Sequence, residues 1–449
     1  MNPGLVVKLR PAGPWRIGSD TGARNRVDTV YHSDSLYSAV CSAMARVGTL
    51  EEWLDATARA AEPAVCFSSC FPYVEETLCV VPPRTVWPPA SAGISARVRW
   101  KSARFVPLEI VRGILAGRKI DEFLWSLDGP SECVTPAGRP GPFRTSVRWS
   151  AAVDRLTGAT ERHSTACIEF RTGCGLWLIA SFRDQAARDR WQGPVKAALL
   201  LLADSGFGGE RSRGWGRSEA PEFVEGDLPD MILPPPEAPQ ATGLMEEAIL
   251  DRLVAELVGG EAAVGGEEKK EEATGGSPAD GPTEAAGAGP ANGAGSPRPT
   301  DGPEMKSEAA TTQASAEIVA GVAVLEAEEE AVETQVEFAP VEPEPEPAMA
   351  LSVAGAPQSH WLLSLYTPAA GDTVDWRRGS YTVLTRGGRV ESAAGSGGLK
   401  KQVQMIAEVS VLTAATEPRG TVAEVGPDGF PHPVYRAGFA LAIPLPEAR

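Results

Sequence analysis

The hydrophobic and polar positions of residues 1–225 alternate between strand and helix patterns. Residues 5–9 form an apolar run typical of a buried strand. From Ser33 or Ser35 to Val47, apolar residues recur at steps of three and four, which predicts a helix that Ser33 or Asp34 can cap. The pattern predicts four further elements: a helix over residues 50–61, a hairpin of residues 168–171 and 175–180, a helix over residues 184–204 interrupted near Gly193 and Pro194, and a strand near residues 218–224.

The composition changes at about residue 226. Residues 226–357 are rich in Ala, Gly, Pro and Glu and nearly lack aromatic residues. Such a segment buries too little apolar surface to offset the entropy lost on ordering. We therefore expect a long disordered acidic insert. Its one amphipathic piece, residues 244–258, reads more simply as a transient helix than as a partner-binding element.

Residues 358–449 return to a globular composition. Strands are expected near residues 361–366, 380–385, 408–412 and 438–443, and Gly387-Gly388 is a hairpin turn signal. The sequence thus predicts an α+β protein with a first domain at residues 1–225, an acidic linker at 226–357 and a second, small α+β domain at 358–449.

The charge distribution leaves room for an anionic ligand. The chain has a formal net charge of −17, but residues 221–350 hold 29 of its 59 acidic and 5 of its 42 basic residues. The remainder therefore has a net charge of +7, which permits a phosphate-binding surface. Seven cysteines without CxxC spacing predict buried thiols in a reducing cytoplasm. The pattern predicts no signal peptide and no membrane span, since the longest apolar run is residues 197–203.

The most informative stretch is DSGFGGERSRGWGR, residues 204–217. Its glycines allow positive φ and uncover their amides, and its arginines offer paired donors to phosphate. It follows a predicted helix and lacks a following GK[ST], which disfavours a Rossmann or P-loop site. Phe207 and Trp215 offer flat faces on which bases can stack or which can join the core. A polyphosphate or nucleic-acid backbone is the ligand we expect. The alternative is a tight helix-to-strand turn with solvated arginines.

Residues 206–217, GFGGERSRGWGR, resemble the signature glycine-rich loop of the repeat-associated mysterious proteins (RAMPs) of CRISPR systems. HSDSLYSAV (residues 32–40), GGLKKQV (397–403) and PHPVYRAGFA (431–440) resemble the subunit that caps the crRNA 5′ end in type III-A, Csm-type complexes. The resemblance covers residues 1–225 and 358–449, whereas the acidic insert departs from the usual compactness of that family. Motif likeness alone separates type III-A from the type III-B counterpart.

The resemblance implies two ferredoxin-like domains of the RRM-type βαββαβ topology, with a β-hairpin thumb. It implies a non-catalytic cytoplasmic subunit that binds the crRNA 5′ handle, with no cofactor, metal or membrane. The implied protein partners are the large polymerase/cyclase-like subunit and a neighbouring backbone RAMP subunit, with target RNA near the thumb. The thumb is expected within residues 143–166, with its turn at residues 154–158.

The RNA-binding residues expected on this basis lie in four places. They are His32 and Ser33 at the first helix; Gly206, Gly208, Gly209, Arg211, Ser212, Arg213, Gly214, Trp215 and Arg217 in the loop; Arg144, Arg148 and Arg155 in the thumb; and Lys400 and Lys401 in the second domain. A helix start offers free amides to phosphate. Because the carboxylate of Asp34 would repel an anion, Asp34 is expected to cap the helix and not to bind phosphate.

Two other functions stay open at the level of sequence. Some RAMP relatives are endoribonucleases that use a histidine against the 2′-OH, and His32 is the one candidate near the expected RNA face. The chain could instead be mainly a protein scaffold, such as the type III-B counterpart. No pair of carboxylates or cluster of ligands suggests a metal site.

Overall fold

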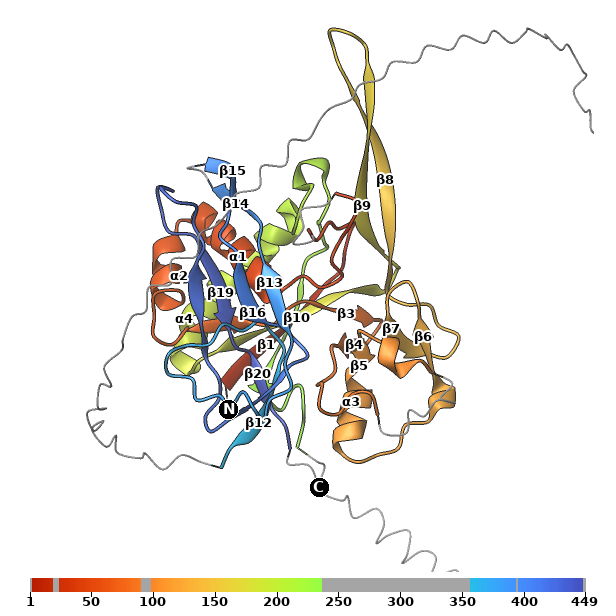
Figure 1. Cartoon of the computed structure of the whole chain (residues 1–449), viewed down its shortest axis with the longest axis vertical. Helices are drawn as coiled ribbons and strands as arrows, with labels where there is room; N and C mark the ends of the chain where they lie inside the picture. Colours follow the sequence, from red (N-terminus) through yellow and green to blue (C-terminus); the bar gives the residue numbers. More distant parts are fainter. Residues whose placement is uncertain (1, 19–23, 90–97, 236–355, 393–394, 447–449) are drawn as a thin grey trace, which may run out of the picture. The chain divides into compact units, whose positions relative to one another are not determined.

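The computed structural model describes residues 2–18, 24–89, 98–235, 356–392 and 395–446 (Figure 1). Most of the expected acidic insert, including its amphipathic piece at residues 244–258, lies outside the described residues. Before it, β11 (Glu222–Leu228) carries on past the expected boundary at residue 225. Ile232 is also fully buried in the core. The first globular region therefore extends further than its composition indicates.

The first region is built on a seven-stranded antiparallel sheet. β1 (Asn2–Leu9) lies between β11 and β10 (Cys174–Phe182), and β10 pairs in turn with β2 (Val65–Phe67) and β3 (Phe71–Val74). β4 (Thr77–Val80) and β5 (Val106–Pro107) extend the sheet beyond β3.

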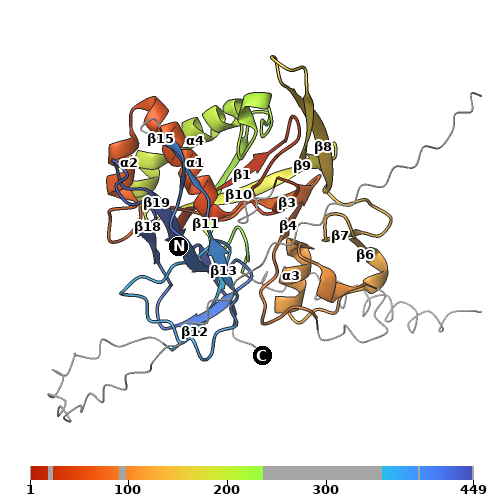
Figure 2. The same ribbon diagram turned by 45° about the horizontal axis from the view of Figure 1, so that its top comes forward.

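Two helices complete the topology of this sheet. In chain order the elements are β1, α1 (Ser33–Val47), β3, β10, α4 (Gln185–Ser205) and β11, which makes a βαββαβ unit with strand order 4-1-3-2. α1 and α4 contact each other, as Figures 1 and 2 show. The ferredoxin-like fold expected for the first region is present, because each helix carries the chain past one strand: α1 connects β1 to β3 across β10, and α4 connects β10 to β11 across β1.

The helices bury the faces that the sequence pattern indicates. α1 buries Leu36, Val40 and Met44, and ends at Gly48 in the left-handed region. α4 continues without interruption through Pro194, against expectation, and buries Trp191 and Leu199. Two shorter helices, α2 (Leu50–Ala56) and α3 (Leu108–Leu115), lie elsewhere in the region.

A smaller lobe follows the main sheet. It contains α3, the 3₁₀ turns η1 (Trp100–Ser102) and η2 (Glu122–Leu124), and the pair β6 (Trp125–Asp128) and β7 (Cys133–Pro136). From it the chain enters a long ribbon of β8 (Phe143–Val153) and β9 (Thr160–Phe170), which projects from the molecule in both views (Figures 1 and 2). The hairpin predicted between residues 168–171 and 175–180 is wrong: β9 pairs with β8, and β10 pairs with strands of the main sheet.

In the second region, every regular element among the described residues 356–392 and 395–446 is a strand. β12 (Gln358–Leu362) lies between β17 (Val411–Ala414) and β20 (Ala442–Pro444), and β18 (Gly420–Glu424) pairs with β19 (Tyr435–Phe439). The α+β class of the chain is confirmed. The helices of a second βαββαβ unit are not found among these described residues.

Gly387-Gly388 is not the hairpin turn that we predicted. β13 (Val383–Arg386) pairs with β16 (Val403–Ile406), and β14 (Arg389–Ser392) pairs with β15 (Gly395–Leu399), so both flanking strands run along one longer arm. The two glycines interrupt the outgoing limb of this arm, where Lys400 N–H donates to Gly388 O at 2.9 Å. A Gly-Gly pair marks a break in pairing as readily as a reversal of the chain.

Both regions contribute to one hydrophobic core. Trp361, Phe439 and Ile443 belong to the same buried cluster as Leu5 and Trp177. The ring of Phe439 packs edge-on against Tyr37 of α1, with centroids 5.6 Å apart. The described parts of the two regions therefore form a single compact unit.

Candidate functional site

The glycine-rich loop lies between α4 and β11, where the sequence placed it. Gly206, Gly208, Gly214 and Gly216 all have φ between 72° and 95°, which is the left-handed region. Phe207 N–H donates to Gly216 O at 2.9 Å, so the loop is closed on itself. The Phe207 ring stacks on Trp15 at a centroid distance of 5.1 Å and anchors the loop to the core.

The glycine amides are not the bare donors that we expected. The N–H groups of Gly206, Gly209, Gly214 and Gly216 donate to the carbonyls of Leu202, Arg16, Arg211 and Pro14 respectively. Their hydrogen-bonding capacity holds the loop in shape. In the structure these glycines fix the conformation of the loop. Their contact with RNA stays a prediction.

The polar side chains of the loop differ in accessibility. Arg211 is paired with Glu391 at the arm of β14, and Arg213 Nη1 lies 3.2 Å from Glu210 Oε2. Ser212, Arg213 and Arg217 are exposed. The expectation for Trp215 as an exposed stacking face is wrong, because its side chain is packed inward and 9% exposed. The accessible face of the loop is therefore a hydroxyl and two guanidinium groups.

A segment that the sequence did not single out ties this loop to the base of the ribbon. Trp15 exchanges backbone hydrogen bonds with Ile168 of β9 at 2.8 and 2.9 Å, and Arg16 O accepts from Gly209 N–H. Arg16 Nη1 also donates to Ala166 O at 3.0 Å. The only sequence signal for this link was a polar glycine-containing loop after β1, which does not specify a partner.

The ribbon β8–β9 has the turn that the sequence predicts. Asp154 Oδ1 accepts from Leu156 N–H at 2.8 Å and its Oδ2 accepts from Thr157 Oγ1 at 2.7 Å, which fixes the reversal. At the base, Arg144 and Arg148 both pair with Glu169, whereas Arg155 is exposed at the tip. The basic character of the ribbon is thus partly neutralised at its base.

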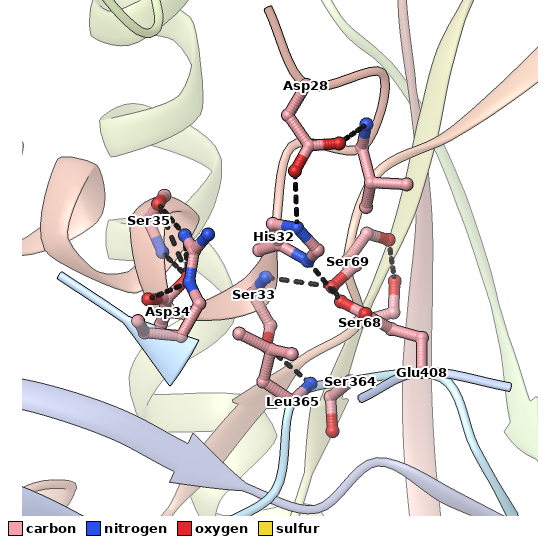
Figure 3. Close-up of polar contacts among 12 residues, drawn as sticks. Asp28, His32, Ser33, Asp34, Ser35, Ser68, Ser69, Ser364, Leu365 and Glu408 are labelled. Carbon is pink, nitrogen blue, oxygen red and sulfur yellow. Dashed lines mark hydrogen bonds and ion pairs between the residues drawn. The ribbon is translucent and has the colours of Figure 1, made fainter. Parts of the chain in front are cut away.

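The start of α1 is not an exposed phosphate site. His32 is 3% exposed, and its two ring nitrogens donate to Glu408 Oε1 at 2.8 Å and Asp28 Oδ2 at 3.0 Å (Figure 3). Ser33 N–H donates to Ser69 Oγ at 2.9 Å, and Ser33 Oγ accepts from Leu365 N–H at 3.0 Å. The expectation that His32 and Ser33 contact RNA is therefore wrong, because the second region covers this helix end.

Asp34 is likewise not a helix cap. His32 occupies the N-cap position of α1 and makes no capping bond with its side chain. Asp34 Oδ1 accepts from Arg386 Nη2 at 3.0 Å, and its Oδ2 pairs with Arg436. All three side chains are buried. Burial opposes ionisation of Asp34, but the two guanidinium groups outweigh this and hold its pKa well below the usual range.

The charge of His32 follows from the same balance. Burial alone would lower its pKa, but the charge of Glu408 and the hydrogen bonds to Asp28 and Glu408 raise it to about 9. The pKa of each carboxylate is lowered in turn. The imidazolium is a buried structural cation with both nitrogens occupied, so it has no lone pair for general-base catalysis.

We expect this histidine to make stability depend on pH. Because the folded pKa is raised, the stabilisation is complete below the unfolded value of roughly 6.5 and is lost as pH rises toward 9. The free energy of unfolding should fall by about 2 kcal/mol between about pH 6 and about pH 8. Urea unfolding followed by circular dichroism measures this.

The matched control for the pH experiment is His432→Gln, since His432 is exposed. That variant should keep the wild-type slope of stability against pH, while His32→Gln should flatten it. A wild-type stability that does not change over this interval would contradict the assignment of a charged buried His32.

The second region has a sequence match of its own. Residues 356–445 match the family model described as the CRISPR Csm4 C-terminal domain. This region is therefore similar to Csm4 C-terminal domains. The resemblance that residues 397–403 and 431–440 carry is thereby confirmed. No curated protein matches the chain.

Several solved structures are similar to the chain. A crystal structure of a Csm1–Csm4 cassette in complex with cA4 contains a chain with 14% identity and a TM-score of 0.45, covering 100% of this chain and 99% of that one. A crystal structure of a Csm3–Csm4 subcomplex of the type III-A CRISPR-Cas interference complex contains a chain with 11% identity and a TM-score of 0.48, and the match covers 99% of each chain. A type III-B Cmr-beta structure bound to cognate target RNA contains a chain with 8% identity and a TM-score of 0.29, and the match covers 50% of this chain and 61% of that one. The ferredoxin-like assignment rests on the strand order and not on these scores.

Both predicted lysines lie in the second region, within the residues that match the Csm4 model. Lys400 is half-buried, and burial, with a contribution from Arg436, lowers its pKa. Lys401 is exposed and its Nζ lies 2.7 Å from Asp428 Oδ1. Of the two, Lys401 is the one placed to meet a ligand, and RNA contact there stays a prediction.

The described ranges contain no group of three histidine, cysteine, aspartate or glutamate side chains arranged to hold a metal ion. Nor does any helix within those ranges have the length and apolar character needed to cross a membrane. The ion pairs around α1 link the first region to the second region.

Proposed function

We propose that the chain is a non-catalytic, cytoplasmic RNA-binding subunit of a type III-A CRISPR interference complex, which holds the crRNA 5′ handle. The observation that carries this is the glycine-rich loop, closed between the last helix and last strand of a βαββαβ unit. It presents Ser212, Arg213 and Arg217 to solvent next to the base of a long β-ribbon. The Csm4 C-terminal domain supports the type III-A choice.

The partners follow from the similar proteins. Csm4 is found with Csm1 in one solved complex and with Csm3 in another. We infer that this chain docks a large Csm1-type subunit and adjoins a backbone RAMP subunit. The ribbon β8–β9 would act as the thumb and reach along target RNA with its tip, where Arg155 and Leu156 are exposed.

A catalytic role has no geometric support in the described residues. The endoribonuclease alternative needs a histidine that reaches the 2′-OH, and His32 is buried between two carboxylates. His163 lies on the ribbon and His432 on an exposed turn, so neither lies in the glycine-rich loop. We therefore propose binding without cleavage.

The test is RNA binding by the full chain with its large-subunit partner. Arg213→Ala/Arg217→Ala should weaken binding of a crRNA that carries its 5′ handle about tenfold at roughly 0.1 M salt, and lower the salt slope by about 1.4, because two phosphate contacts are lost. The measurement is fluorescence anisotropy across a salt series, with the same crRNA lacking the handle as comparison.

Arg118→Ala/Lys119→Ala is the matched control, since these neighbouring cations are also exposed but lie in the lobe that contains α3. It should leave the handle preference unchanged. Equal binding of both RNAs, with no response to Arg213→Ala/Arg217→Ala, would refute the capping function. Cleavage of repeat RNA that His32→Ala abolishes would restore the nuclease alternative.

A further inference from the structure

A short turn between β12 and β13 presents aromatic and basic side chains together. Residues 375–381 read DWRRGSY, and we call them the 375–381 turn. The turn is fixed on β17: Asp375 N–H donates to Thr413 O at 2.8 Å, and Ser380 N–H donates to Val411 O at 2.8 Å. Asp375 Oδ1 also accepts from Arg377 N–H at 3.1 Å. The turn is therefore held by the sheet on both sides of its exposed residues.

Its two aromatic side chains stay at the surface. Trp376 is 37% exposed and Tyr381 is 39% exposed. Their rings lie edge to face, with centroids 5.3 Å apart and an interplanar angle of 79°. Holding two large rings in a fixed pair outside the core leaves apolar area in water, which is a common mark of a binding surface.

Three cations accompany the rings. Arg377 and Arg378 are adjacent and exposed, and neither guanidinium is ion-paired with any carboxylate of the described residues. Arg84, from the first region, reaches the neighbouring Thr382 and donates to its hydroxyl. At the base of the ribbon, by contrast, Arg144 and Arg148 are paired with Glu169. The two guanidinium groups beside the exposed rings therefore have donors available for an anionic ligand.

We propose that the 375–381 turn is a second binding surface, for single-stranded RNA. Bases would stack against Trp376 and Tyr381 while the arginines hold the flanking phosphates, which is the combination that single-strand binding uses. Tryptophan, tyrosine and arginine also anchor protein interfaces. The adjacent unpaired guanidinium groups favour a polyanion. The inference rests on the proposed RNA-binding function for its ligand, and uses residues outside the glycine-rich loop and outside the motifs at residues 32–40, 397–403 and 431–440.

The experiment compares two double variants of the full chain. The probe is a fluorescein-labelled single-stranded RNA of mixed sequence, about 30 nucleotides long, so that it exceeds one binding site. Arg377→Ala/Arg378→Ala should weaken binding about tenfold and lower the salt slope by about 1.4. Trp376→Ala/Tyr381→Ala should weaken it about tenfold with the slope unchanged, because stacking releases no counterions.

The controls separate this surface from general effects. Arg118→Ala/Lys119→Ala removes two exposed cations elsewhere, and Phe123→Ala removes an exposed ring that is not part of the turn. Both should bind as the wild type does. The urea midpoint of unfolding is measured for each variant alongside its RNA binding, to check that the variant folds. Arg377→Gln/Arg378→Gln replaces the first pair if that pair fails to fold.

The outcomes also separate this inference from the proposed function. If Arg213→Ala/Arg217→Ala weakens binding and both turn variants do not, the second surface is refuted while the capping function stands. If the turn variants alone weaken binding, the second surface stands and the glycine-rich loop loses its role. If the turn variants bind RNA normally but lose the large subunit, the turn is a protein interface and the inference is wrong.

Discussion

Asp34→Asn is expected to lower the free energy of unfolding by about 3–5 kcal/mol, because it removes the carboxylate charge that two buried guanidinium groups share. Asp34 accepts from Arg386 Nε at 3.1 Å and Nη2 at 3.0 Å, and pairs with Arg436. Asparagine keeps the size and one carbonyl oxygen, so the variant isolates the loss of charge. Urea unfolding of the full chain measures the effect.

Asp184→Asn is the matched control for this prediction. Asp184 also lies at a helix start, where its Oδ1 accepts from Ala187 N–H at 2.7 Å, but it is exposed. Asparagine caps helices about as well as aspartate, so the loss should be within about 0.5 kcal/mol. Similar losses for the two variants would show that Asp34 is an ordinary helix-start residue and that the buried cluster contributes little.

The cost is large because the ion pairs join distant parts of the chain. Arg386 Nη2 also donates to Ser35 Oγ at 3.2 Å, and Arg436 Nη2 donates to Gly387 O at 2.7 Å. Weakening the cluster therefore loosens the contact between α1 and the second region. If the capping function holds, Asp34→Asn should weaken RNA binding only because it destabilises the fold, since no atom of this cluster lies at the exposed face of the glycine-rich loop.

The sequence predicted those features that local patterns determine. The apolar patterns of β1, α1 and α4 were predicted, and the glycine-rich loop was placed between the correct elements. The βαββαβ order itself came from the family resemblance, because β3, the second strand of the unit, was not predicted. Asp154 and Gly158 identified the turn of the ribbon because turn chemistry is a property of a few neighbouring residues.

The features that it missed depend on partners far along the chain. His32 and Ser33 read as an exposed helix start, since Glu408 and Leu365, which bury them, lie more than three hundred positions away. Trp215 read as a stacking face because a sequence does not show to which side a loop aromatic points. Gly387-Gly388 read as a hairpin because the pattern gives strands but not their pairing partners.

Gly216→Ala is expected to lower the free energy of unfolding by roughly 3–5 kcal/mol, well beyond the effect at a neighbouring glycine. An added Cβ would lie 1.9 Å from Phe207 O and 2.8 Å from Phe207 N. It would separate Phe207 from Gly216 and break the hydrogen bond that closes the loop. The stacking of Phe207 on Trp15 would shift with it.

Gly214→Ala supplies the comparison, because φ is 77° at Gly214 and 79° at Gly216 while nothing lies within 4 Å of the added Cβ at Gly214. It carries the same backbone strain without the clash, and should cost about 1 kcal/mol. Urea unfolding and RNA anisotropy are measured on both variants. Equal losses would mean that the left-handed backbone alone sets the cost. A larger loss for Gly216→Ala in both measurements would show that the closure between Phe207 and Gly216 gives the loop the shape in which Arg213 and Arg217 face the RNA.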